Sequence, residues 1–121
     1  MEKINKITWD ELPQEQVNAQ MKRKFIHGAE VMLAKMEFED GFIVPWHSHA
    51  NEQITEVVEG TLRFWFDDDE DNPVDVHAGE AVVIPGNRRH KALVIGKVIE
   101  FDLFAPPRQD WIDKTDNYLR K

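Results

Sequence analysis

The fold of this chain is decided by the stretch Gly41-Phe-Ile-Val-Pro-Trp-His47-Ser-His49-Ala-Asn-Glu-Gln53-Ile-Thr-Glu-Val-Val-Glu-Gly60. On an extended strand, residues i and i+2 point to the same face, so His47 and His49 can both reach one metal ion. Gln53 has the same parity past a short turn, and its amide oxygen is a candidate third ligand. The pattern predicts a metal site, with a pair of ordinary surface histidines as the alternative interpretation.

A second stretch ends on another histidine. It reads Gly79-Glu-Ala-Val-Val-Ile-Pro85-Gly-Asn-Arg-Arg-His90, an apolar strand followed by a Pro-Gly turn. A third imidazole from a neighbouring strand would complete a set of ligands facing one cavity. The remaining two histidines, His27 and His77, lack partners at such spacing, and we interpret them as structural or surface residues.

The rest of the pattern predicts an all-β domain. Short segments rich in β-branched and aromatic residues lie between glycines and prolines, at 31–38, 53–59, 61–66, 74–77, 81–84, 91–95 and 97–104. Such spacing is typical of an antiparallel sandwich or barrel. Helix is expected only near the ends, as a short turn at 9–13 and as a short helix or ordered tail after residue 106. In that tail, Trp111, Thr115 and the pair Tyr118/Leu119 share one face at helical spacing.

Composition excludes several classes of protein. The chain has 121 residues, 15 Lys+Arg, 23 Asp+Glu and no cysteine. One domain is therefore expected, without disulfides, thiolate metal ligands or a cysteine nucleophile. The acidic balance disfavours nucleic-acid binding, and no apolar run is long enough for a membrane span or a signal peptide, so we expect a cytoplasmic protein. Five consecutive acids at 67–71 supply most of the net charge of −8 and predict a solvated turn.

The first stretch resembles the first conserved motif of the cupin superfamily. That motif runs Gly, five residues, His-x-His, three or four residues, Glu, six residues, Gly. Gly41, His47, His49 and Gly60 match it, and Gln53 stands where Glu is usual.

The second stretch resembles the second cupin motif. Gly79, Pro85 and His90 match, Asn87 replaces a glycine, and Val94 stands where Asn is usual. The resemblance implies a double-stranded β-helix barrel of the jelly-roll kind, with an N-terminal arm at 1–24, the barrel at 25–105 and a C-terminal tail at 106–121. It also implies one divalent metal ion on the barrel axis, held by His47, His49, Gln53 and His90.

Replacing Glu by Gln makes the whole ligand set neutral. A divalent ion (Ni, Zn, Fe, Mn or Cu) would keep its full charge there, which favours Lewis-acid chemistry and the binding of an anionic molecule. The alternative is that Gln53 only hydrogen-bonds a ligand.

Residues 100–111 resemble the ending of small cupins of the KdgF type, which open the ring of unsaturated uronates. The resemblance implies that Asp102, Phe104 and Arg108 lie near the metal. Asp102 would be a general acid/base, Arg108 a fork for the substrate carboxylate, and Phe104 an apolar wall with Trp46 or Trp65. The alternatives are a structural ion pair for Asp102, a contact that fixes the tail for Arg108, and plain core positions for the aromatic residues. Nearby cations at 88, 89 and 91 either attract an acidic substrate or are simply solvated.

Three hypotheses follow. The first is a metal-dependent enzyme that converts a small sugar acid, such as a 4,5-unsaturated uronate, to its linear keto form. The second is a cupin dioxygenase that uses a redox-active metal, and the third is a non-enzymatic binding module. Small cupins commonly pair through an edge strand, so we also expect a homodimer, with an edge formed by Phe25, Ile26 and residues 31–38.

Overall fold

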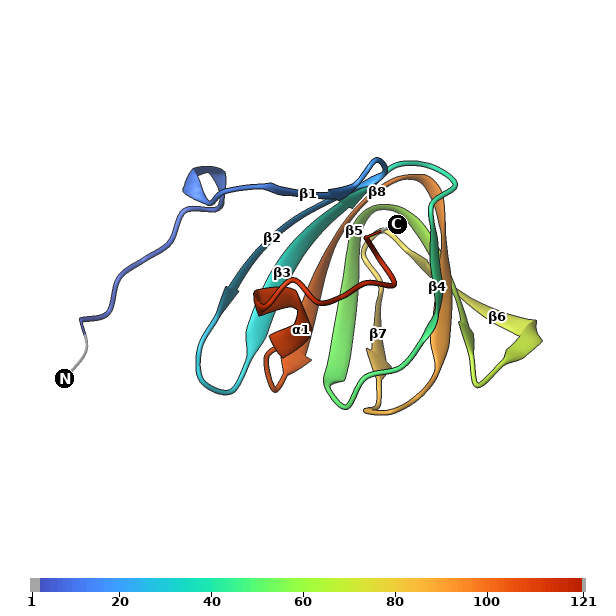
Figure 1. The fold of residues 1–121 in the computed structure, drawn as a ribbon. Helices are drawn as coiled ribbons and strands as arrows, with labels where there is room; N and C mark the ends of the chain where they lie inside the picture. Colours follow the sequence, from blue (N-terminus) through green and yellow to red (C-terminus); the bar gives the residue numbers. More distant parts are fainter. Residues whose placement is uncertain (1–2, 121) are drawn as a thin grey trace.

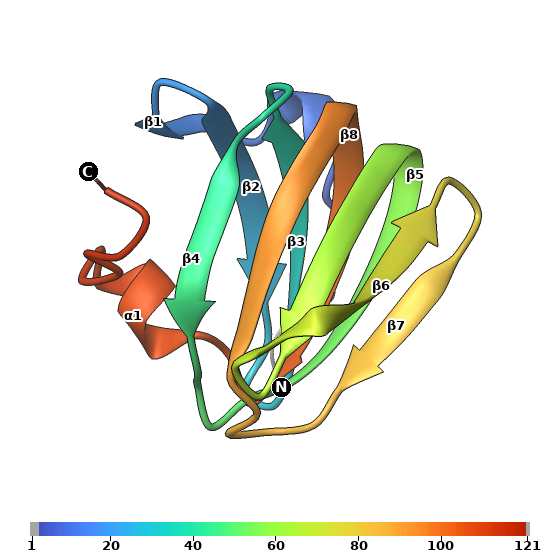
Figure 2. The ribbon, with the colours of Figure 1, turned by 90° about the vertical axis from the view of Figure 1, so that its right-hand side faces the viewer.

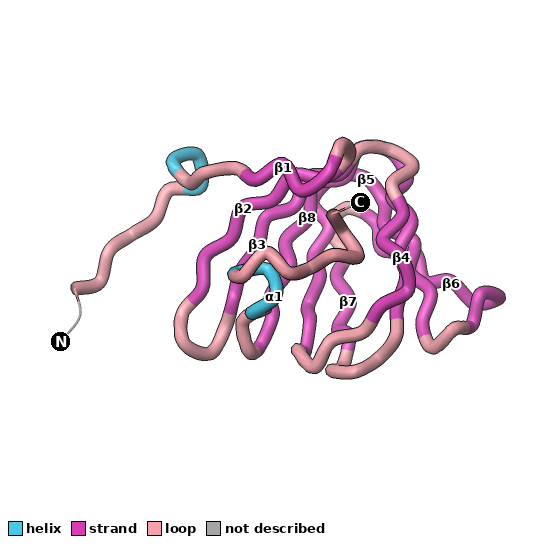
Figure 3. The backbone as a smooth tube through the Cα atoms, viewed as in Figure 1, coloured by secondary structure: helices cyan, strands magenta, loops and turns pink. Residues whose placement is uncertain are grey.

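The computed structural model describes residues 3–120 as an antiparallel β structure (Figure 3). Residues 1, 2 and 121, at the outer ends of the expected arm and tail, lie outside the described residues. The strands are β1 (Glu15–Asn18), β2 (Met21–His27), β3 (Met32–Phe38), β4 (Ile43–His47), β5 (Glu52–Phe66), β6 (Asp69–His77), β7 (Ala81–Ile84) and β8 (His90–Ala105). The helical elements are a 3-10 turn, η1 (Trp9–Glu11), and a single α-helical turn, α1 (Gln109–Ile112). No helix among the described residues has both the length and the apolar character to cross a membrane.

Two long strands, β5 and β8, hold the fold together. They pair with each other from Glu52↔Ala105 to Phe66↔His90. The late half of β8 also pairs with β3, and its early half pairs with β4, while β5 carries β7 at one end and β6 at the other. The strands curl around a common interior (Figures 1 and 2). The predicted all-β jelly-roll-like architecture is confirmed.

Glycines bend the two long strands instead of ending them. The sequence pattern predicted separate strands on either side of Gly60 and Gly96, but each pair is one continuous strand. Gly60 has φ +81° at an irregularity in the register with β8, and a Cβ there would lie 2.4 Å from the Lys97 carbonyl oxygen. Only glycine fits such a left-handed, crowded position, so the residue serves as a bulge.

Alternating burial identifies the inner face. In β3 the buried residues are Met32, Ala34, Met36 and Phe38, and their neighbours in sequence are partly exposed. Polar side chains break this apolar interior on β5 and β8, where Gln53, Thr55, Glu100 and Asp102 are also buried. Buried polar groups need partners, so this part of the interior is where chemistry is expected.

The predicted edge is wrong for residues 31–38, whereas Phe25 and Ile26 lie on β2 beyond its pairing with β1. β3 pairs with β2 on one side and β8 on the other, so residues 31–38 form no free edge. Phe25 packs inward, 6.5 Å from the Trp111 ring. Pairing extends beyond this strand through β2 to β1, so the sheet reaches into the region expected to be an arm. A long apolar strand stabilises the fold more inside a sheet than at its edge, because the backbone groups on both of its sides are then hydrogen-bonded.

The C-terminal segment returns past β4 (Figures 1 and 2). Its helix ends at Ile112, so the helical face expected to include Thr115 does not form, and Thr115 is exposed. A buried ion pair instead fixes the segment, with Arg23 on β2 2.9 Å from Asp116. Trp111 and Leu119 still join the core.

Candidate metal centre

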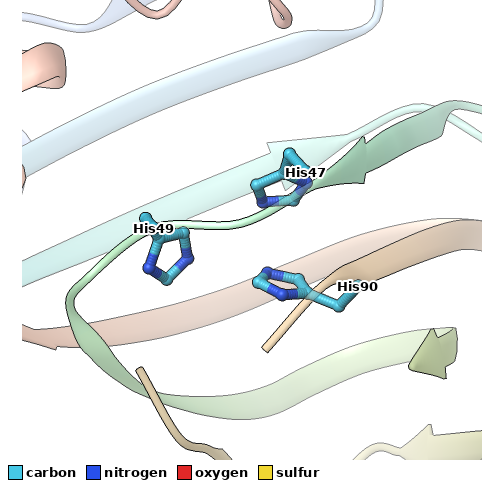
Figure 4. A group of neighbouring side chains, drawn as sticks. All are labelled: His47, His49 and His90. Carbon is cyan, nitrogen blue, oxygen red and sulfur yellow. The ribbon is translucent and has the colours of Figure 1, made fainter. Parts of the chain in front are cut away.

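Three histidines converge at one end of the barrel. His47 ends β4, His49 follows two residues later, and His90 begins β8 directly opposite His47. One nitrogen from each side chain lies within 4.8 Å of the other two, an arrangement that can hold one metal ion. Figure 4 shows the rings of His47 and His49 along one stretch of backbone and the ring of His90 facing them from another.

Backbone carbonyls fix the tautomer of all three rings. Each Nδ1 lies close to a carbonyl oxygen two residues away in the chain. The acceptors are Pro45 at 2.8 Å, Asn51 at 3.1 Å and Arg88 at 2.8 Å. A carbonyl oxygen can only accept, so each Nδ1 carries the hydrogen and each Nε2 keeps its lone pair for a ligand. Metal-binding histidines are typically oriented in this way, so the residues fit a divalent transition metal.

Burial keeps these imidazoles neutral. It lowers the pKa of His47 to about 3, assisted by the neighbouring His90. Burial also lowers the pKa of His49 to about 4, assisted by the charge of Arg108, and it lowers the pKa of His90. A metal competes with protons for the same lone pairs, so neutral rings at physiological pH leave the site ready for a cation.

A one-way chain of hydrogen bonds orients Gln53. Thr55 donates its hydroxyl hydrogen to Asp102 Oδ1 at 2.6 Å, because a carboxylate only accepts. The Thr55 oxygen therefore accepts from Gln53 Nε2 at 2.8 Å. This turns Gln53 Oε1 toward the histidines, 3.0 Å from His49 Nε2. The position of Gln53 along the strand predicted that this oxygen is a metal ligand, and the structure directs it at the three histidines.

Asp102 lines the same cavity as His47, His90 and Gln53. It is buried, and burial raises its pKa, while hydrogen bonds from Glu100, Thr55 and Gln53 and the charge of Arg108 oppose that rise. A carboxyl group in this position can exchange a proton with a molecule bound beside the histidines.

Arg108 is close to the site but already engaged. Its Nε and Nη2 donate to Asp110 at 2.9 and 2.8 Å, and Nη2 also donates to the Tyr118 hydroxyl. The guanidinium is buried against the rings of Phe104 and Trp111, at 5.0 and 4.8 Å. The two guanidinium nitrogens expected to bind a substrate carboxylate are therefore bonded to Asp110. Arg108 acts on the histidines only through its positive charge, which lowers the pKa of His49.

Of the expected aromatic wall, only Phe104 borders the cavity. Its ring meets His49 edge-on at 5.6 Å and is almost completely buried. Trp46 and Trp65 do not line the cavity; the Lys91 ammonium lies 5.6 and 5.0 Å from their rings. The expectation for the two tryptophans is therefore wrong, because their parity on the strands points them away from the interior.

Sequence reasoning missed Tyr118. Its ring stacks on His47 with centroids 4.5 Å apart, and it lines the cavity. Helical spacing had grouped this residue with the packing face of a helix, and no local motif links it to a histidine 71 positions earlier. Thr55 and Glu100 were missed for a related reason, since their roles depend on cross-strand neighbours.

The acidic run pairs with the cations beside His90. Asp67 and Asp68 form an exposed turn, the other acids of the run begin β6, and three ion pairs join this region to the end of the loop before β8 and to the start of β8. They are Asp67–Arg88, Asp68–Arg89 and Glu70–Lys91. Exposed pairs contribute little stability. They do neutralise the cations that were considered as attractors for an acidic substrate.

His27 and His77 lie outside the cluster. Both are exposed, and His77 Nδ1 lies 3.0 Å from the Thr61 hydroxyl. The division of the five histidines into three that converge and two that do not is as the spacing predicted.

Comparisons with known proteins agree with this geometry. The model of the cupin domain matches residues 34–103. The chain is similar to KdgF from Halomonas sp., at 27% identity over 86% of this chain and 96% of that one, with a TM-score of 0.77. An RmlC-like cupin from Shewanella frigidimarina matches at 25% identity over 87% and 93%, with a TM-score of 0.79.

The fold is shared more widely. The polyketide cyclase RemF from Streptomyces resistomycificus aligns at 20% identity over 86% of this chain and 80% of that one, with a TM-score of 0.72. A search of curated proteins found no match. The family model covers more than half of the chain, including all three converging histidines, and therefore the chain belongs to the cupin family.

Proposed function

We propose that this cupin is a metal-dependent enzyme that converts a small sugar acid, such as a 4,5-unsaturated uronate, to its open-chain keto form. One observation carries the proposal: a buried carboxyl, Asp102, borders the same cavity as His47, His90 and Gln53, whose side-chain oxygen lies 3.0 Å from His49. The similarity to KdgF from Halomonas sp. supports it. His47, His49, Gln53 and His90 would hold the ion.

One acid/base group is enough for the proposed reaction, because Asp102 returns the proton that it accepts. Asp102 accepts the proton of the hydroxyl at C1, the bond between C1 and the ring oxygen breaks, and the ring oxygen keeps the electron pair within an enolate. Asp102 then delivers the proton to C4, which gives the open-chain keto acid with no net change in protons. A bound divalent ion would hold substrate oxygens and stabilise the developing negative charge.

Positive charge and aromatic surface would complete the binding of the anion. Arg108 is buried against the Phe104 ring, and its Nε and Nη2 are hydrogen-bonded to Asp110. It would therefore attract the anion by its positive charge and not by direct hydrogen bonds from these two atoms. Tyr118 covers His47 and shares the Arg108 contact. We expect the substrate carboxylate to be held by the metal and this field together.

The test mixes metal-replete protein with 4,5-unsaturated galacturonate and follows loss of the conjugated-alkene ultraviolet absorbance. The uncatalysed rate must be subtracted, because the ring also opens spontaneously. Acceleration that requires metal is expected, and no acceleration with any of the five candidate metals would reject the uronate. Metal analysis and an oxygen electrode in the same preparation test the dioxygenase: bound iron with oxygen uptake would favour it over the proposed reaction.

We also propose a homodimer formed through the outer face of the sheet. One row of neighbours across the strands is Ile26, Leu33, Leu103, Ile54 and Val83, of which the last three are exposed. The adjacent row places Lys35 on one side of Phe101 and Glu56 on the other. A two-fold axis near Phe101 would bring each Lys35 to the partner's Glu56, as self-complementary packing requires.

Light scattering after size exclusion tests the dimer. Leu103→Glu introduces a charge in the middle of the apolar row and should give a monomer. The matched variant Val74→Glu alters an exposed valine on β6, away from this face, and should stay dimeric. A monomeric wild type, or a dimeric Leu103→Glu protein, would reject this interface.

A further inference from the structure

Glu100 is a buried acid with no assigned role. It lies on β8, two residues before Asp102, and is 2% exposed. Its cross-strand neighbours are the apolar Met36 and Val57, which are also buried. Within the described part of the chain, its Oε2 has no hydrogen-bond partner. An ionised carboxylate in such a place would be costly, so its presence calls for an explanation.

Only one proton placement satisfies this pair of acids. Asp102 accepts hydrogen bonds from Thr55 and Gln53, whereas no donor among the described residues reaches Glu100 Oε2. Burial raises the pKa of Glu100 well above its usual range, and the neighbouring Asp102 raises it further. Two adjacent buried carboxyls do not both ionise, and the hydrogen bonds from Thr55 and Gln53 make Asp102 the better place for the charge.

We propose that Glu100 is a positioning residue, a neutral carboxylic acid whose O–H donates to Asp102 and thereby fixes the direction of the hydrogen-bond chain that orients Gln53. With Glu100 as a donor, Asp102 is a pure acceptor and Thr55 must donate to it. Thr55 must then accept from Gln53 Nε2, and Gln53 Oε1 must face the histidines. Glu100 thus acts on the metal through three intermediaries without touching it.

This inference rests on the proposed metal site but not on the proposed substrate. Its consequence is therefore measured on metal binding, which can succeed or fail independently of activity on a uronate. Outer partners of metal ligands typically change metal affinity by about 10- to 100-fold. Losing the donor should have an effect of that order.

The experiment compares Glu100→Gln, which keeps a donor, with Glu100→Met, which has similar length and none. Zinc affinity is measured by competition with a chelator, and the visible spectrum of the cobalt-loaded protein reports ligand geometry. We expect Glu100→Gln to bind zinc within about threefold of wild type, and Glu100→Met to bind it at least about tenfold more weakly with an altered cobalt spectrum. Glu59→Gln, an exposed acid on the same strand as Gln53, is the control and should change neither.

Carbon-13 NMR of glutamate-labelled, zinc-loaded protein supplies a second readout that needs no destabilising variant. The Glu100 carboxyl signal, assigned by its absence in Glu100→Gln, should remain at the protonated position at neutral pH. A signal at the carboxylate position would overturn the proposal. So would unchanged zinc affinity in Glu100→Met, or an equal loss in Glu100→Gln, which would indicate that a donor is not what matters.

Discussion

Replacing Thr55 by valine tests the orientation of Gln53 most directly. The two side chains have nearly the same shape, so the change removes a hydroxyl and little else. Thr55 is completely buried. Its hydroxyl accepts a hydrogen bond from Gln53 Nε2 at 2.8 Å and donates one to Asp102 Oδ1 at 2.6 Å. Valine leaves Gln53 with only the 3.4 Å contact to Asp102 and deprives Asp102 of its shortest hydrogen bond.

The expected cost follows from these two groups. Leaving a buried polar group without its partner costs about 1–3 kcal/mol, and the extra methyl of valine returns about 0.8 kcal/mol. From the middle of that range the net loss is about 1 kcal/mol in the free energy of unfolding, and for a domain of this size it lowers Tm by about 4 °C. Free of Thr55, the carboxamide can turn its nitrogen toward the histidines, so zinc affinity should fall by about tenfold or more.

Thermal unfolding of the metal-free protein measures the first effect, and chelator competition measures the second. Thr55→Ser keeps the hydroxyl and is the matched control, with affinity expected close to wild type. A Thr55→Val protein that melts within about 2 °C of wild type and binds zinc equally well would refute the hydrogen-bond chain as the cause of the Gln53 orientation.

Four further results are expected. Asp102→Asn should lower kcat by about 100-fold or more, because it removes the proton acceptor, and a full rate in the ultraviolet assay would reject that role. Adding zinc at about 100 times its Kd should raise the unfolding free energy by about 2.7 kcal/mol, and a chelator should reverse the rise in Tm. Gly60→Ala should be strongly destabilising in urea melts, because its Cβ would meet backbone 2.4 Å away at φ +81°. For Glu15, burial raises the pKa, but hydrogen bonds and charges from Arg120 and Arg23 outweigh it, so the folded-state pKa lies below the reference value of 4.5. The stabilisation is therefore complete above about pH 4.5 and is lost as the pH falls through the lower folded-state pKa, so the Tm advantage of wild type over Glu15→Gln should vanish in acid.

Much of the fold and the centre of the site could be predicted locally. Period-two alternation and turn residues identified the strands, because side-chain direction in a strand depends only on position. The parity of His47, His49 and Gln53 nominated the ligands for the same reason. The prediction of two separate strands on either side of Gly60 was wrong. In the sequence, a glycine that ends a strand cannot be told from one that bends it until the opposing backbone is known.

Contacts between distant segments could not be predicted in this way. Asp110 occupying the Arg108 fork, Tyr118 stacking on His47, and Lys91 lying near Trp46 all bring together residues whose spacing follows no motif. The same holds for β3, which lies inside the sheet because β2 and β8 both pair with it.

The sequence by itself determined the all-β class, the cupin motifs and the set of candidate ligands, since these depend on residue type and short-range periodicity. Only the tertiary structure decided which oxygen of Asp102 accepts from Thr55, which way the Gln53 carboxamide faces, and that burial raises the pKa of Glu100. Those properties depend on cross-strand register and on burial, because a hydrogen bond acquires its direction, and a carboxyl its proton, from neighbours that only folding supplies.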